Sequence, residues 1–158
     1  MKAQGRESVW DYPRLPSVEP FHGLIQIVYG GIMVVNSTLA QRVLETSHPP
    51  GYYIPKADIL MDMFFPTPRT TICEFKGVAS YWGITVDGQR EPDIAWSYEN
   101  PRAGYAAIRG YLAFYAGKMD GCYVDGEKVN AQLGDFYGGW VTSNIIGPFK
   151  GGPGTRGW

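Results

Sequence analysis

The sequence is poor in the residues that build metal sites and covalent cross-links. Its 158 residues include two cysteines, Cys73 and Cys122, and two histidines, His22 and His48. No Cys-x-x-Cys pair occurs, and the histidines have no spacing typical of metal ligands. We therefore predict no metal and no cofactor. Two cysteines are compatible with a reducing compartment, so we predict a cytoplasmic protein.

Long apolar runs and an excess of either charge are also missing. No segment is long enough to span a bilayer, and Met1–Gly5 has no apolar signal region. The formal net charge is −1, so the sequence lacks the basic excess that proteins dedicated to nucleic acids carry. We expect neither a membrane nor a nucleic acid as a partner.

Common catalytic signatures are absent as well. The sequence has no His-Glu-x-x-His, no Gly-x-Ser-x-Gly and no Walker pattern. The segment Gly151–Gly157 superficially resembles a phosphate loop. It lacks the Gly-Lys-Ser/Thr ending and a following helix that would direct amides at an anion, so we do not assign that function to it.

Glycine, proline and aromatic residues are abundant. The chain has 21 glycines and 12 prolines, and 15% of its residues are aromatic. This composition favours many short strands and turns over a helix bundle, and the length suits one domain with one core. We predict a mainly β, single compact domain with one or two short helices. It would have an extended arm at residues 1–20, a β-rich core at 21–133 and a Gly/aromatic strap at 134–158.

Two turn signals are strong. Gly30-Gly31 separates two apolar runs, Leu24–Tyr29 and Ile32–Ser37, and Asp125-Gly126 follows Gly121–Val124. Both pairs suit two-residue hairpin turns that need positive φ. Further strands are expected at Arg69–Glu74, Val78–Asp87, Ile94–Tyr98 and Tyr111–Tyr115.

A short helix is predicted to begin at Thr38. Thr38 and Gln41 have capping-box spacing, and the helix would end near Ser47 because His48 precedes a proline. Glu45 would then lie in the last turn, at the unfavourable end of the helix dipole.

Two stretches carry the candidate chemistry. The first, Cys73–Trp82, contains a thiol, an acid, a lysine and three aromatic rings, and the second runs from Glu45 to Pro55 and is stiffened by prolines. Glu45, His48, Lys76 and Cys73 would form a catalytic group if the fold brings them together. The alternatives are a buried structural Cys73 and an ordinary surface Lys76.

An aromatic set is predicted to line a pocket. Adjacent rings on a strand face opposite sides of a sheet, so one subset can fill the core while the other lines a cavity. Rings with one or two charged groups suit a flat heterocycle or a cation. The alternative is plain core packing. The set comprises Tyr52, Tyr53, Tyr81, Trp82, Trp96 and Tyr98.

Several motifs, in order, resemble the domain of unknown function 427 (DUF427) family between about residues 9 and 130. They are Val9–Pro13, Glu45–Pro50, Tyr52–Pro55, Cys73-x-Phe75-Lys76-Gly77-x-Ala79-x-Tyr81-Trp82, Trp96-x-Tyr98-x-x-Pro101 and Ala113–Tyr115. The tail from Asp135 looks like an extension found in cyanobacterial members.

The resemblance implies a fold similar to the β-tent (Mss4-like) fold of methionine sulfoxide reductase B and the ligand-binding domain of cereblon. Those relatives commonly carry paired Cys-x-x-Cys zinc ligands, which this sequence lacks, so neither zinc nor sulfoxide reduction is carried over. A nucleotidyltransferase label is also attached to the family, but the sequence has no paired metal-binding acids and no phosphate loop to support it.

Three hypotheses for function follow. The first is a binding module for a small flat or cationic ligand. The second is an enzyme in the same pocket, with Glu45 or His48 as general base and Lys76 stabilising negative charge. The third is an interaction protein whose strap, residues 134–158, completes a homodimer or docks on a partner.

Overall fold

The protein is built from short β-strands, as the composition predicts. A computed structural model describes residues 5–132, 137–151, 154, 155 and 158. Within this part the only helical segments are three-residue 3-10 turns, so the predicted short helices are limited to these turns. No helix in the described residues has the length and apolar character needed to cross a membrane.

The strands are joined by tight turns and by longer loops that contain the 3-10 turns. They are β1 (Glu7–Ser8), β2 (Ser17–Phe21), β3 (Ile25–Tyr29), β4 (Ile32–Ser37), β5 (Ala40–Leu44), β6 (Gly51–Tyr53), β7 (Phe64–Cys73), β8 (Gly77–Val86), β9 (Gln89–Ser97), β10 (Leu112–Phe114), β11 (Gly121–Val124), β12 (Glu127–Lys128), β13 (Asn130–Ala131), β14 (Trp140–Val141) and β15 (Ile145–Ile146). The 3-10 turns are η1 (Val9–Asp11), η2 (Lys56–Asp58), η3 (Met61–Met63), η4 (Ala106–Ile108) and η5 (Ala116–Lys118).

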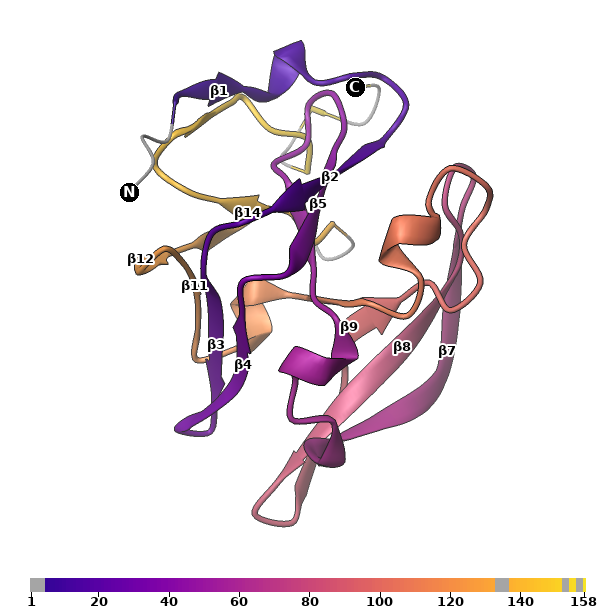
Figure 1. The fold of residues 1–158 in the computed structure, drawn as a ribbon, viewed down its shortest axis with the longest axis vertical. Helices are drawn as coiled ribbons and strands as arrows, with labels where there is room; N and C mark the ends of the chain where they lie inside the picture. Colours follow the sequence, from indigo (N-terminus) through magenta and orange to yellow (C-terminus); the bar gives the residue numbers. More distant parts are fainter. Residues whose placement is uncertain (1–4, 133–136, 152–153, 156–157) are drawn as a thin grey trace.

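Three antiparallel sheets make up most of the molecule. Their strand orders are β10-β9-β8-β7, β12-β11-β3-β4 and β2-β5-β6. The long β7 and β8 lie on one side of the molecule and the β3–β4 hairpin on the other (Figure 1). Two small ladders, β13-β14 and the parallel pair β1-β15, attach the C-terminal segment to the rest of the chain.

The glycine turn signals are confirmed. Gly30 and Gly31 connect β3 to β4 with φ of 59° and 77°, and Asp125 and Gly126 connect β11 to β12 with φ of 49° and 86°. These left-handed values are those that a two-residue hairpin of this type requires.

The helix predicted from Thr38 is wrong, because residues 40–44 form strand β5. This strand lies in the middle of its sheet and pairs with β2 on one edge and β6 on the other. A one- to two-turn helix has little stability of its own, whereas a central strand satisfies its backbone hydrogen bonds on both edges. Glu45 follows this strand, so the helix-dipole argument for Glu45 no longer applies.

Buried side chains form one large core and a second, ring-rich cluster. The large core includes Phe114, Ile54 and Trp140, packed between the β3–β4 and β8–β9 strands. The second cluster is dominated by aromatic residues and lies on the other face of the β8–β9 strands, with Tyr81 and Trp96 paired across the ladder. The ring-rich cluster forms one side of the cavity described next.

Candidate functional site

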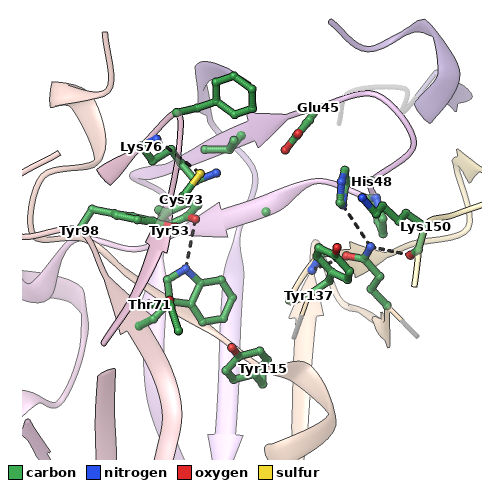
Figure 2. Close-up of a pocket in the computed structure, with 18 of the residues that line it drawn as sticks. Glu45, His48, Tyr53, Thr71, Cys73, Lys76, Tyr98, Tyr115, Tyr137 and Lys150 are labelled. Carbon is green, nitrogen blue, oxygen red and sulfur yellow. Dashed lines mark hydrogen bonds between the residues drawn. The ribbon is translucent and has the colours of Figure 1, made fainter. Parts of the chain in front are cut away.

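A cavity of about 270 Å³ opens beside the ring-rich cluster (Figure 2). Three segments far apart in the sequence surround it: residues 45–51, residues 71–76, and a tail segment made of 137–139 and Lys150. The volume lies just below the roughly 300–1,000 Å³ of pockets for drug-sized ligands, so a molecule with one ring is the appropriate size.

The walls of the cavity are aromatic because of strand alternation. Tyr81 and Trp96 point to the cavity side of β8 and β9, and Tyr53 and Tyr98 complete this wall. The indole Nε1 of Trp96 donates a hydrogen bond to the Tyr53 hydroxyl at 3.3 Å. Tyr115 packs against the Trp96 ring at 4.6 Å between centroids. The wall is therefore ordered by contacts among its own rings.

Lys76 brings a nearly buried positive charge to this wall. It lies in the turn between β7 and β8 and is only 9% exposed, with its Nζ 5.7 Å from the centroid of the Tyr98 ring. Burial alone would lower its pKa, but attraction to Tyr53, Cys73 and Glu45 raises it above the ordinary value, so the ammonium stays charged. No carboxylate in the described part of the chain forms an ion pair with it.

The loop opposite Lys76 is held by backbone hydrogen bonds to both ends of the chain. Thr46 N–H donates to Pro13 O at 2.9 Å, and Lys150 N–H donates to Ser47 O at 2.8 Å. Trp140 N–H donates to Pro50 O at 2.9 Å. The loop that carries Glu45 and His48 is thus fixed by the N-terminal arm and by the tail together.

Glu45 presents a carboxylate that lies between two lysines. Burial raises its pKa, while Lys76 and Lys150 lower it less strongly. No hydrogen bond or ion pair to the Glu45 side chain is found among residues 5–132, 137–151, 154, 155 and 158. The carboxylate is therefore available to a bound molecule.

His48 is held as a neutral imidazole. The Gln132 side-chain oxygen accepts from Gly139 N–H at 3.1 Å, so its amide nitrogen is the end that donates to Lys150 O at 2.7 Å. That same nitrogen lies 3.3 Å from His48 Nδ1, which must accept. The proton therefore resides on Nε2. Burial, with Lys150 and Lys76 nearby, lowers the pKa of His48 to about 4, in agreement with this neutral state.

Cys73 lies beside Lys76 at the edge of the cavity. Its Sγ accepts the Lys76 backbone N–H at 3.4 Å, and the residue is half-buried. The structure thus brings Glu45, His48, Cys73 and Lys76 to one cavity, together with four of the six proposed rings.

Two proposed rings lie elsewhere. Tyr52 neighbours Tyr53 on β6 and points into the large core, where it stacks on Trp140 at 5.1 Å. Trp82 neighbours Tyr81 on β8 and also faces the large core, and its Nε1 donates to Ser97. Alternation along a strand separates each pair of adjacent rings.

The sequence did not identify the contribution of the tail. Lys150, Tyr137 and Gln132 line the cavity, as do Thr71 and Tyr115. A weak signal at Lys150 is that Phe149-Lys150-Gly151 repeats Phe75-Lys76-Gly77, although three residues are too few to indicate an internal repeat. Both copies of this short motif supply a lysine to the same cavity.

Gly138 closes the cavity against the Trp96 indole, and replacing it tests that closure. A Cβ at this position would collide with the Trp96 ring. We expect Gly138→Ala to lower the free energy of unfolding by about 1–3 kcal/mol, as overpacking does. Urea denaturation followed by circular dichroism would measure it.

The matched control is Gly117→Ala, because a Cβ there would meet only Ala131 at an ordinary 3.7 Å. If the two variants are equally stable, the tail segment does not lie against Trp96.

Comparison with known proteins identifies a family and no activity. Residues 17–125 match the model of the family described as "Domain of unknown function (DUF427)". No curated protein matches the chain. The matched range includes the loop with Glu45 and His48 and the turn with Lys76, but it ends before the tail residues that complete the cavity. No cluster of three or more metal-ligating side chains is found in the described residues.

Proposed function

Because this chain belongs to the DUF427 family, whose description assigns no activity, we propose its function from the cavity: it binds a small planar molecule that carries an acidic group. The observation that carries the proposal is the buried, charged Lys76 in a ring-walled cavity without a carboxylate partner in the described residues. A buried charge is costly unless it is compensated, and a ligand carboxylate or phosphate would compensate this one.

A cationic ligand fits the cavity less well. Four rings around it already have a cation of the same chain near one face, at 4.8–5.8 Å from the ring centroid. These pairs are Arg69 with Tyr81, Lys76 with Tyr98, Lys118 with Tyr115 and Lys150 with Tyr137. These four cations outnumber Glu45 and Glu74, the two carboxylates of the described residues that line the cavity, so the surroundings repel a second cation and attract an anion.

The rings supply the affinity for the planar part of the ligand. Trp96, Tyr53 and Tyr98 offer apolar surface that is preorganised by mutual contacts. Offset or edge-to-face packing of another ring against such surfaces is worth about 0.5–1.5 kcal/mol beyond the buried area. A homodimer through residues 134–158 stays a prediction, since the described tail residues pack on their own chain and part of the tail lies outside the described residues.

The test uses three probes of similar size and different charge. Cinnamate, cinnamamide and benzyltrimethylammonium would be titrated into the purified protein by calorimetry. We expect cinnamate to bind most tightly. The variant Lys76→Gln should weaken cinnamate binding by about 10- to 100-fold, because a hydrogen bond to a charged group is worth about 1.5–3 kcal/mol. Its effect on cinnamamide should be small.

The matched control is Lys128→Gln, which removes an exposed lysine of β12 that does not line the cavity. It should bind cinnamate like the unchanged protein. Equal affinities for the three probes, or no binding of cinnamate, would contradict the proposal. Native mass spectrometry of freshly purified protein would reveal a natural ligand that stays bound.

A further inference from the structure

Two polar groups in the cavity are not needed to hold an acid. The Glu45 carboxylate would repel one, and the His48 N–H is a neutral donor beside two lysines that already supply positive charge. In the view of Figure 2, Glu45 lies between Lys76 on one side and His48 with Lys150 on the other. A base placed between two groups that stabilise negative charge is the arrangement needed to move a proton from carbon.

Building on the proposed binding of a planar acid, we infer that the cavity catalyses proton transfer at a carbon next to a carbonyl, with Glu45 as the base and His48 as the donor to the carbonyl oxygen. The substrate class is an aromatic 2-oxo acid. Its ring would lie against Trp96, its carboxylate near Lys76 and its keto oxygen near His48 and Lys150.

The fixed hydrogen bonds of His48 suit it to this task. Gln132 holds Nδ1 as an acceptor, so Nε2–H is the hydrogen-bond donor that the ring has left to offer. A neutral imidazole that donates to a carbonyl oxygen is a known way to stabilise the enolate formed in such reactions. Because Nδ1 accepts, His48 in this state does not offer a free nitrogen lone pair as a base. Glu45 is therefore the residue that acts as the base.

The surroundings of Glu45 also suit a base. Its side chain is half-buried and free of hydrogen bonds and ion pairs within the described residues. Burial raises the pKa of Glu45, which strengthens it as a proton acceptor compared with a carboxylate in water. Lys76 and Lys150 act in the opposite direction and favour the ionised carboxylate that a base requires.

The proposed step balances without an oxidant or a second substrate. Glu45 takes the proton from the carbon beside the keto group, and the electron pair of that C–H bond forms a carbon–carbon double bond. The carbonyl π pair moves to oxygen, where His48 Nε2–H and the Lys150 ammonium stabilise the negative charge. A proton returned to the same carbon regenerates the keto acid, which is seen as hydrogen exchange. A proton placed on the oxygen gives the enol.

Phenylpyruvate in D₂O is the probe for this chemistry. We expect the unchanged protein to accelerate deuterium incorporation at its benzylic carbon above the protein-free rate, measured by the loss of the methylene signal in ¹H NMR. The variant Glu45→Gln should reduce the accelerated rate by about 10²- to 10⁴-fold, the usual contribution of a general base. Glu91→Gln is the matched control, because Glu91 is exposed on β9 and does not line the cavity.

Cinnamate has no enolisable carbon and therefore separates binding from catalysis. Glu45→Gln should bind cinnamate at least as tightly as the unchanged protein, since the change removes a negative charge from the cavity. Cinnamate binding without accelerated exchange would overturn the catalytic inference and leave the binding proposal standing. Exchange that is equally fast in Glu45→Gln would also overturn it, and failure of both probes to bind would remove both proposals.

Discussion

Trp140→Ala should lower the free energy of unfolding by about 3–5 kcal/mol, the usual cost of removing a large buried ring. Trp140 is 1% exposed and stacks on Tyr52 at 5.1 Å. Its Nε1 donates to Phe114 O at 3.0 Å, so the variant leaves a cavity and also an acceptor without its donor. Equilibrium denaturation in guanidinium chloride would measure the loss.

The same variant should weaken cinnamate binding. Strand β14 begins at Trp140, immediately after Gly138 and Gly139, which close the cavity. Loosening this anchor would free the segment that faces Trp96. Binding should be measured at denaturant-free conditions where the variant is still folded, as judged by circular dichroism.

Trp10→Ala is the matched control. Trp10 is 39% exposed and makes an edge contact with Trp158 and a hydrogen bond to Pro148 O. Its removal should cost about 1 kcal/mol for the hydrogen bond and a smaller packing loss than at Trp140, because the ring is partly exposed. Similar losses in both variants would contradict the larger contribution assigned to the buried Trp140.

The local turns could be predicted from the sequence because their chemistry is local. Gly30-Gly31 and Asp125-Gly126 adopt the positive φ values that two-residue hairpins need, and no distant contact is required to predict them. Residues 40–44 could not be assigned in this way. Their capping-box spacing is a weak helix signal, and the pairing of β5 with β2 and β6 on both edges outweighs it. The more specific tent-like arrangement implied by the family resemblance stays a prediction.

The cavity could be predicted in part for the same reason. Side-chain alternation on β8 and β9 separates Tyr81 from Trp82 and places Trp96 on the same face as Tyr81. It therefore predicts that adjacent rings on one strand point to opposite faces of the sheet. It cannot say which side is hollow. The tail contribution depends on long-range contacts, such as Lys150 with Ser47 and Gln132 with His48, that no local pattern encodes.

The family match covers only part of the residues that line the cavity. The match covers residues 17–125, whereas the closing wall comes from Tyr137, Gly138 and Lys150. The matched part supplies Glu45, His48 and Lys76. We therefore expect truncation after residue 132 to widen the cavity. It would also remove the two hydrogen bonds, with Gly139 and Lys150, that orient the Gln132 amide and so fix the His48 tautomer.

Acidification should destabilise the protein through His48. The pKa of this imidazole falls from its ordinary 6.5 to about 4 in the folded state, because it is buried and lies near Lys150 and Lys76. Between these values the unfolded chain binds a proton that the folded chain does not, so stability is lost as the pH falls from about 6.5 to about 4. The loss from this one group is at most about 3 kcal/mol, at 1.36 kcal/mol per pKa unit.

The pH dependence must be separated from that of Glu45, which faces the same cavity. Burial raises the pKa of Glu45, so lowering the pH favours the folded state at that residue and opposes the His48 effect. Comparing unfolding free energies of the unchanged protein and of His48→Asn between pH 7 and pH 4 isolates the imidazole, because asparagine does not titrate. The unchanged protein should lose stability relative to His48→Asn as the pH falls, and His22→Asn, which retains His48, should show the same loss as the unchanged protein. Parallel curves for the unchanged protein and His48→Asn would contradict this prediction. A protonated Nδ1 cannot accept a hydrogen bond from Gln132, so protonation of His48 must cost the folded state that contact.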